Sequence, residues 1–117
     1  MGHENDNSAS NCLRKLIASD MDLARVYVTV AHAAYKRHAL NEVEFARLKA
    51  VKFYRDALHS VLQISKSERQ AFLTDLEALR TKIEWLSMKS DAAGDPSRMA
   101  FEKASIDELL RLVHEEA

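Results

Sequence analysis

Residues 41–64 read NEVEFARLKAVKFYRDALHSVLQI, and this stretch predicts the central helix of the fold. It contains neither glycine nor proline, and its apolar residues recur every three or four positions, as on an amphipathic helix. One apolar stripe consists of Val43, Ala46, Ala50, Phe53 with Tyr54, Ala57, Val61 and Ile64, and a second of Phe45, Leu48, Val51, Leu58 and Leu62. Two stripes predict packing neighbours on both sides of this helix. Asn41, with Glu44 three residues later, forms a capping pattern that predicts the helix start.

A second helix is predicted before it, over residues 21–38. One of its apolar stripes consists of Leu23, Val26, Tyr27, Val30 and Ala34, and the other of Ala24, Val28, Ala31 and Tyr35. Residues 19–22 also resemble a cap, which predicts a break after a shorter segment that starts near Asn11. Because the connection to the central helix is short, the two helices are predicted to be antiparallel neighbours.

The C-terminal half predicts two further helical regions. Ser65 and Glu68 form a capping box before a single apolar stripe of Phe72, Leu76, Leu79, Ile83 and Leu86, with Trp85 beside it. Residues 89–98 are predicted to be an internal linker, since they contain Gly94-Asp95-Pro96. The last apolar face consists of Ile106, Leu109, Leu110 and Val113, and the sequence leaves open whether residues 96–116 form one helix or two.

The fold class follows from these patterns and from what the chain lacks. Its 117 residues include only two glycines and one proline, too few for the turns of an all-β domain. We predict an all-α fold, a small antiparallel up-down helical bundle with three long helices plus a shorter C-terminal helix. Residues 1–10, which are polar, are predicted to be a disordered N-terminal tail, and residues 11–117 to form a single helical-bundle domain.

The composition indicates which cellular compartment and which classes of binding partner to expect. The formal net charge of −1 gives no electrostatic reason to expect nucleic acid or an anionic membrane surface as a partner. No apolar run approaches the roughly 20 residues of a membrane span, and the polar start is not a secretory signal. The single cysteine, Cys12, excludes an internal disulfide and suits a reducing compartment. We therefore expect a cytoplasmic protein that makes no membrane contact.

No catalytic or metal-binding constellation stands out. Asp56 and His59 share a helix face at metal-ligand spacing, but the further carboxylates and histidine that a di-iron bundle needs are missing. No sequence signature places a general base beside Cys12. The absence of a glycine-rich loop excludes a phosphate-binding loop and a dinucleotide-binding motif. We expect no enzymatic activity, no metal, no cofactor and no small-molecule ligand.

His32 carries the alternative function. The stretch VAHAAYK at residues 30–36 resembles the phospho-acceptor helix of histidine phosphotransfer domains, which are helical bundles of similar length. The resemblance implies His32 as the phospho-acceptor, with Lys36 offsetting the charge of the phosphoryl group. The chain departs from the family pattern His-x-x-Lys-Gly, because Tyr35 occupies the third position after His32 and no glycine follows Lys36.

A protein–protein interaction module is the function that we predict first. AVKFYRDAL at residues 50–58 resembles the second helix of tetratricopeptide-type hairpins and of MIT domains, which implies a hairpin architecture. The helices also carry more apolar residues than a three-helix core needs, which predicts a protein partner or self-association, with a homodimer as one form. The candidate partner-binding residues are Val28, Ala33, Tyr35, Phe45 and Val51. The alternative is that the C-terminal helix covers them.

Overall fold

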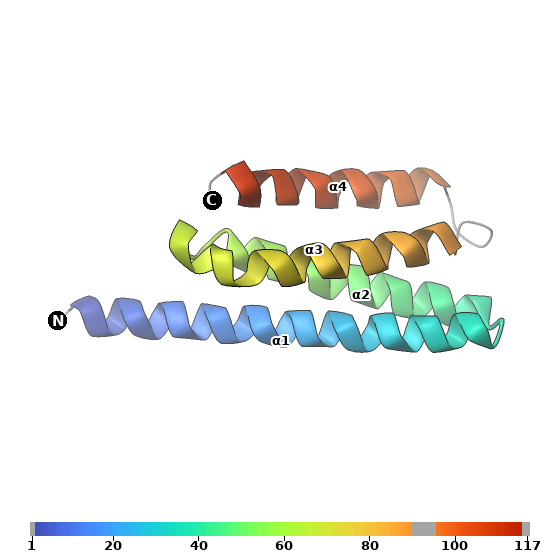
Figure 1. Cartoon of the computed structure of the whole chain (residues 1–117), viewed down its shortest axis with the longest axis horizontal. Coiled ribbons are helices and arrows are strands. Elements are labelled where there is room, and N and C mark those ends of the chain that lie inside the picture. Colours follow the sequence, from blue (N-terminus) through green and yellow to red (C-terminus); the bar gives the residue numbers. More distant parts are fainter. Residues whose placement is uncertain (1, 90–95, 116–117) are drawn as a thin grey trace.

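The structure, a computed structural model, describes residues 2–89 and 96–115. Within these residues it contains four α-helices and no strand: α1 (Gly2–Lys36), α2 (Leu40–Val61), α3 (Lys66–Lys89) and α4 (Pro96–Glu115). Successive helices run in opposite directions side by side, and the molecule measures 56 × 24 × 19 Å (Figure 1). The predicted all-α helical bundle is confirmed.

Helix α1 is longer than the sequence predicts. It begins at Gly2, so it includes residues 2–10, for which the sequence predicts a disordered tail. It also passes through the predicted break at residues 19–22. Beyond Gly2 this helix contains no glycine or proline. Ile17, just before the predicted break, and Met21, within it, are both buried. Packing of this continuous face therefore outweighs the local capping preference.

The turn between α1 and α2 is closed by backbone hydrogen bonds around His38. This residue has a φ of 59°, in the left-handed region. The N–H of Ala39 donates to the carbonyl of Ala34 at 2.9 Å, and the N–H of His38 donates to that of Tyr35 at 3.0 Å. These two bonds define a Schellman motif, which fixes the antiparallel hairpin. The sequence predicts Asn41 as the N-cap of α2. In the structure the N-cap residue is Ala39, so this prediction is wrong.

The most extensive helix contact lies between α1 and α2. Its centre is lined by small residues without exposed surface: Ala24, Ala31, Ala34, Ala46, Ala50 and Ala57. Small side chains at a helix contact let the two backbones approach closely. Helix α3 packs on both α1 and α2, and the hydroxyl of Tyr54 in α2 donates to the carbonyl of Leu76 in α3 at 3.0 Å.

Helix α3 starts at the predicted capping box. The Glu68 N–H donates to Ser65 Oγ at 3.4 Å, and Ser65 Oγ donates to Glu68 Oε1 at 2.8 Å. One turn into the helix, the buried guanidinium of Arg69 donates from Nε to the Val61 carbonyl at 3.0 Å and from Nη2 to the Leu62 carbonyl at 2.9 Å. Arg69 therefore satisfies the C-terminal carbonyls of α2 with a cation, which suits the negative end of that helix.

Helix α4 is a single helix from Pro96 to Glu115, which answers the question that the sequence left open. Its predicted apolar face is buried, namely Ile106, Leu109, Leu110 and Val113. An ion pair and a histidine–carboxylate contact join α4 to α3: Arg80 Nη2 lies 3.2 Å from Asp107 Oδ1, and His114 Nε2 lies 3.0 Å from Glu77 Oε1. Part of the predicted linker at residues 89–98 falls on residues 90–95, which lie outside the described residues.

Candidate functional site

The two apolar stripes predicted on α1 have different surroundings. The stripe that contains Ala24 and Ala31 lies in the core. The other stripe is buried only in part: Ala34 has no exposed surface, whereas the exposed fractions are 38% for Leu23, 54% for Val26 and 46% for Val30. Two stripes predict that this helix touches more than one neighbour, and at these three residues no described helix supplies the second neighbour.

The exposed residues form a regular line along α1. Leu16, which is 49% exposed, continues it toward the N-terminus, and we call Leu16, Leu23, Val26 and Val30 the α1 seam. Leu16, Leu23 and Val30 are seven residues apart, and Val26 follows Leu23 by three, which is the a and d spacing of a coiled coil. The remaining positions of this heptad pattern, all exposed, are Cys12, Ser19 and Ala33. No described helix covers the seam, and its heptad spacing is the sequence signal that would have revealed it.

The residues predicted to bind a partner separate into core and surface. Val28 and Val51 are 9% and 5% exposed and belong to the core, so the prediction that they face a partner needs correction. They lie close to residues of α3 and of α4 respectively, which agrees with covering by later helices. Tyr35 is half-buried, whereas Phe45 is 60% exposed on α2. Ala33, the fifth candidate, is exposed on α1, so Ala33 and Phe45 are the two candidates that lie on the surface.

His32 is exposed near the C-terminal end of α1, where α1 faces α3. Its ring stacks on the indole of Trp85 with centroids 5.1 Å apart, and Tyr35 meets the same indole edge-on at 5.5 Å. Lys36 lines the same surface hollow, about 610 Å³ in volume, together with Lys82 from α3. The structure thus places Lys36 near His32, but one face of the imidazole lies against Trp85.

Arg47 is a buried cation that the sequence analysis missed. Its side chain is 1% exposed, although its position in a lysine- and arginine-rich stretch suggests a surface residue. Glu44 accepts hydrogen bonds from its Nε at 3.0 Å and Nη2 at 2.7 Å, and Glu102 of α4 accepts one from its Nη1 at 2.8 Å. Ser87 Oγ of α3 lies 3.4 Å from Nη1. Burial acts to lower the pKa of Arg47, but the hydrogen bonds to Glu44 and Glu102 outweigh it, so the pKa is raised.

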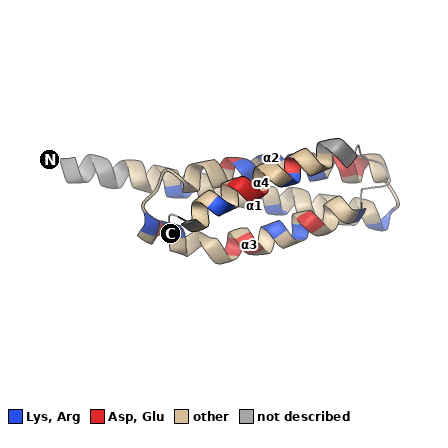
Figure 2. Ribbon diagram, turned by 90° about the horizontal axis from the view of Figure 1, so that it is seen from above, with Lys and Arg blue, Asp and Glu red and all other residues tan. Residues whose placement is uncertain are grey.

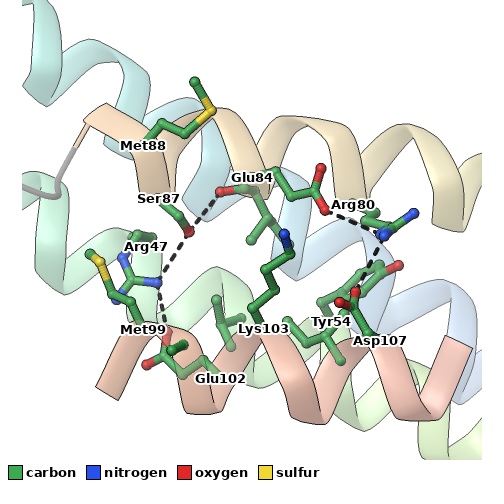
Figure 3. A pocket seen from close by; sticks show the side chains of 14 residues that line it. Arg47, Tyr54, Arg80, Glu84, Ser87, Met88, Met99, Glu102, Lys103 and Asp107 are labelled. Atoms are coloured by element: carbon green, nitrogen blue, oxygen red, sulfur yellow. Dashed lines mark hydrogen bonds and ion pairs between the residues drawn. The ribbon is translucent and has the colours of Figure 1, made fainter. Parts of the chain in front are cut away.

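A cavity of about 340 Å³ lies beside Arg47, between α2, α3 and α4 (Figure 3). Its apolar lining includes Val51, Ile83, Met88, Met99 and Ile106. Charged residues gather at one end, where Arg80 forms ion pairs with carboxylates of α3 and α4. The cavity therefore combines an apolar body with a charged mouth, the composition expected of a small-molecule site.

Two acidic residues lie close together between α1 and α2, namely Asp20 and Asp56. Burial raises the pKa of the Asp20 carboxyl, the nearby Asp56 raises it further, and Lys52 opposes both effects. Asp56 and His59, the pair considered for a metal, are both exposed on α2. Among the described residues no group of three or more histidine, cysteine or acidic side chains is arranged to hold a metal ion.

Surface charge and helix composition complete the description. In the view of Figure 2, basic and acidic residues are interspersed along the helices. None of the described helices combines the length and the apolar character needed to cross a membrane.

Comparison of the chain with known protein families, with curated proteins and with solved structures finds no match.

Proposed function

We propose that this protein is a protein–protein interaction module that self-associates, with a second copy of the chain bound along the α1 seam. The observation that carries the proposal is a row of four large apolar side chains at coiled-coil spacing on the longest helix, with no described helix over it. Exposed apolar residues scattered singly need no explanation, but a contiguous row at interface spacing indicates a contact surface.

A second copy is the occupant that the seam fits. A heptad seam is self-complementary, because each a or d side chain packs between residues of an identical facing helix. Charge selects the direction. An antiparallel pair centred on the seam would place Lys15 opposite Lys36 of the second copy, which is repulsive, whereas a parallel, in-register pair keeps these two lysines apart.

Sedimentation velocity tests the self-association. We expect the wild-type protein to sediment as a dimer and the Val26→Glu variant as a monomer with unchanged helical circular dichroism, because the new carboxylate sits at the centre of the seam. Phe45→Glu is the matched control, since Phe45 is more exposed than Val26 but lies on α2 outside the seam. A monomeric wild type, or a Val26→Glu variant that still forms dimers, overturns the proposal.

Cys12 provides a separate test of direction. It occupies a d position of the heptad pattern and is exposed, so in a parallel pair the two thiols face each other. Mild oxidation should then convert the wild-type dimer into a disulfide-linked dimer that the Cys12→Ser variant cannot form. If the protein is a dimer by sedimentation but resists this cross-link, the parallel arrangement is wrong and the self-association stands.

Phosphotransfer through His32 is the second candidate function. It is supported by the exposure of His32, about one turn before the end of α1, and by the two lysines, Lys36 and Lys82, that line the same hollow. Lysines of this kind offset the charge that a phosphoryl group adds. The test is incubation with phosphoramidate, a chemical phosphoryl donor to histidine. Phosphorylation that is lost in His32→Gln and retained in His59→Gln supports this candidate, and equal labelling of the two variants excludes it.

A further inference from the structure

We propose that the hollow between α1 and α3 binds a small organic anion, with an aromatic body and one carboxylate group. This site, which we call the α1–α3 hollow, is the one that His32 and Trp85 line together with Lys36 and Lys82. It lies where the two helices run side by side (Figure 1). The proposal requires neither self-association along the α1 seam nor phosphorylation of His32.

The floor of the hollow suits an apolar, planar body. Val28 and Leu86 line it and are 9% and 1% exposed, so they close it toward the core. The half-buried indole of Trp85 lines it as well, and this ring already contacts the rings of His32 and Tyr35. A flat aromatic ligand would add one more ring to this cluster. The volume of about 610 Å³ lies within the range of small-molecule sites.

The rim of the hollow carries cations and no described carboxylate. Lys36 of α1 and Lys82 of α3 both line the hollow and are both exposed. Within the part of the chain that the structure describes, neither lysine forms an ion pair, so both ammonium groups can donate hydrogen bonds to a ligand. The described lining is therefore positive by itself. Lys89 adds to this charge from nearby, since its Nζ lies 5.6 Å from the centre of the Trp85 ring.

The surrounding sequence does not cancel this positive charge. Residues 23–41, which include the part of α1 that lines the hollow, contain no aspartate or glutamate. On α3 the acidic residues nearest to Lys82 in sequence are Glu77 and Glu84, and neither lines the hollow. Both form ion pairs with Arg80, at 3.6 Å and 3.3 Å, on the side of α3 that faces α4. A carboxylate at the rim therefore meets a favourable potential, and an ammonium group meets a repulsive one.

The experiment compares three probes that share a phenylbutyl body and differ in charge: 4-phenylbutyrate, 4-phenyl-1-butanol and 4-phenylbutylamine. Calorimetric titration of the full chain should rank them in that order, with the anion tightest and the cation weakest. Trp85 is the only tryptophan of the chain, so its fluorescence reports the location of the bound probe. The emission should change in step with the heat of binding, because the bound ring contacts the indole.

Two lysine variants test the charge at the rim. Lys36→Met and Lys82→Met should each weaken 4-phenylbutyrate binding by roughly threefold, the effect of one exposed ion pair, and leave 4-phenyl-1-butanol binding unchanged. Lys66→Met is the matched control, because Lys66 is also exposed on α3 but does not line the hollow. All three variants replace exposed residues, so the helical circular dichroism should be retained.

Four results would each overturn the proposal. The first is that no probe binds the wild-type protein, and the second is that the alcohol binds as tightly as the carboxylate. The third is that Lys66→Met weakens 4-phenylbutyrate binding as much as Lys82→Met does. The fourth is a heat of binding without any change in Trp85 emission, which would place the bound probe outside the α1–α3 hollow.

Discussion

The two long sides of the α1–α2 hairpin are both apolar, and only one of them is covered. Helices α3 and α4 pack over one side, where Val28, Val51 and the guanidinium of Arg47 are buried. The α1 seam stays exposed, and no described helix packs over it. The difference indicates that apolar character alone does not determine which side of a helix is buried in this fold.

The buried side of α1 mixes small and large residues. Ala24, Ala31 and Ala34 have no exposed surface, and Ile17, Met21 and Val28 are also buried. Residue size therefore does not separate the buried side from the α1 seam, and the position of the neighbouring helices decides which stripe is covered.

The largest expected effect on stability comes from comparing two variants of α1. One carries a new carboxylate on the buried side of the helix, and the other carries it on the α1 seam. Ala31→Asp buries an unpaired charge in the core and should lower the free energy of unfolding by about 3–5 kcal/mol. Val30→Asp, one residue away on the seam, should change it by less than about 0.5 kcal/mol. Urea denaturation in the Val26→Glu background measures both, since association then adds nothing to stability. Equal losses for the two variants would mean that the seam is part of the core.

The sequence predicts the number and type of elements well and the orientation of α1 poorly. The all-α fold, the Ser65 capping box and the buried faces of α3 and α4 depend on local patterns, and the structure confirms them. Two parallel apolar stripes on one helix give no local signal for which of them is covered. That choice depends on helices distant in sequence, so Val28 and Val51 were predicted to face a partner although later helices cover them.

The next effect compares a cation on the covered side with one on the open side. Arg47→Met should lower the free energy of unfolding by about 2–3 kcal/mol, because Glu44 and Glu102 lose their shared partner while remaining largely buried. Lys49→Met should change it by less than about 0.5 kcal/mol, since the Lys49 ammonium lies over the Phe45 ring at a half-exposed position. Thermal or urea denaturation measures both. A loss of under about 0.5 kcal/mol for Arg47→Met would contradict its role as a link between α2 and α4.

The buried arginine shows why the candidate sites were only partly predictable. Arg47 lies in a stretch with Lys49 and Lys52, and a charged run of this kind is usually solvent-exposed. Its partner Glu102 is 55 residues away and on another helix, so no local sequence pattern predicts this ion pair. The cavity depends on the same arrangement of α4, which explains why the sequence predicts no small-molecule ligand.

A pH-dependent effect is expected from Tyr54 on the covered side. Burial raises the pKa of its phenol, and the nearby Glu77 carboxylate raises it further. Ionisation is therefore disfavoured in the folded protein, and stability should be unaffected below about pH 10, the pKa of tyrosine in the unfolded chain. Above that pH the unfolded state loses its proton first, so stability should fall by about 1.4 kcal/mol per pH unit. Tyr54→Phe should lack this slope, and an equal slope in the variant would assign it to other groups.

The smallest expected effect on stability comes from the turn between α1 and α2. A substitution there should change the free energy of unfolding without distinguishing the covered side of the hairpin from the open side. His38 adopts a left-handed conformation that glycine reaches at no steric cost. His38→Gly should therefore raise the free energy of unfolding by about 0.5 kcal/mol, the relief of backbone strain less the greater freedom of glycine in the unfolded chain. His38→Ala is the control, because alanine retains the Cβ atom that opposes this conformation. Dimer dissociation measured by sedimentation should be the same in all three proteins, since the turn lies beyond the last seam residue, Val30. A change in dissociation alone would instead place the turn within the interface.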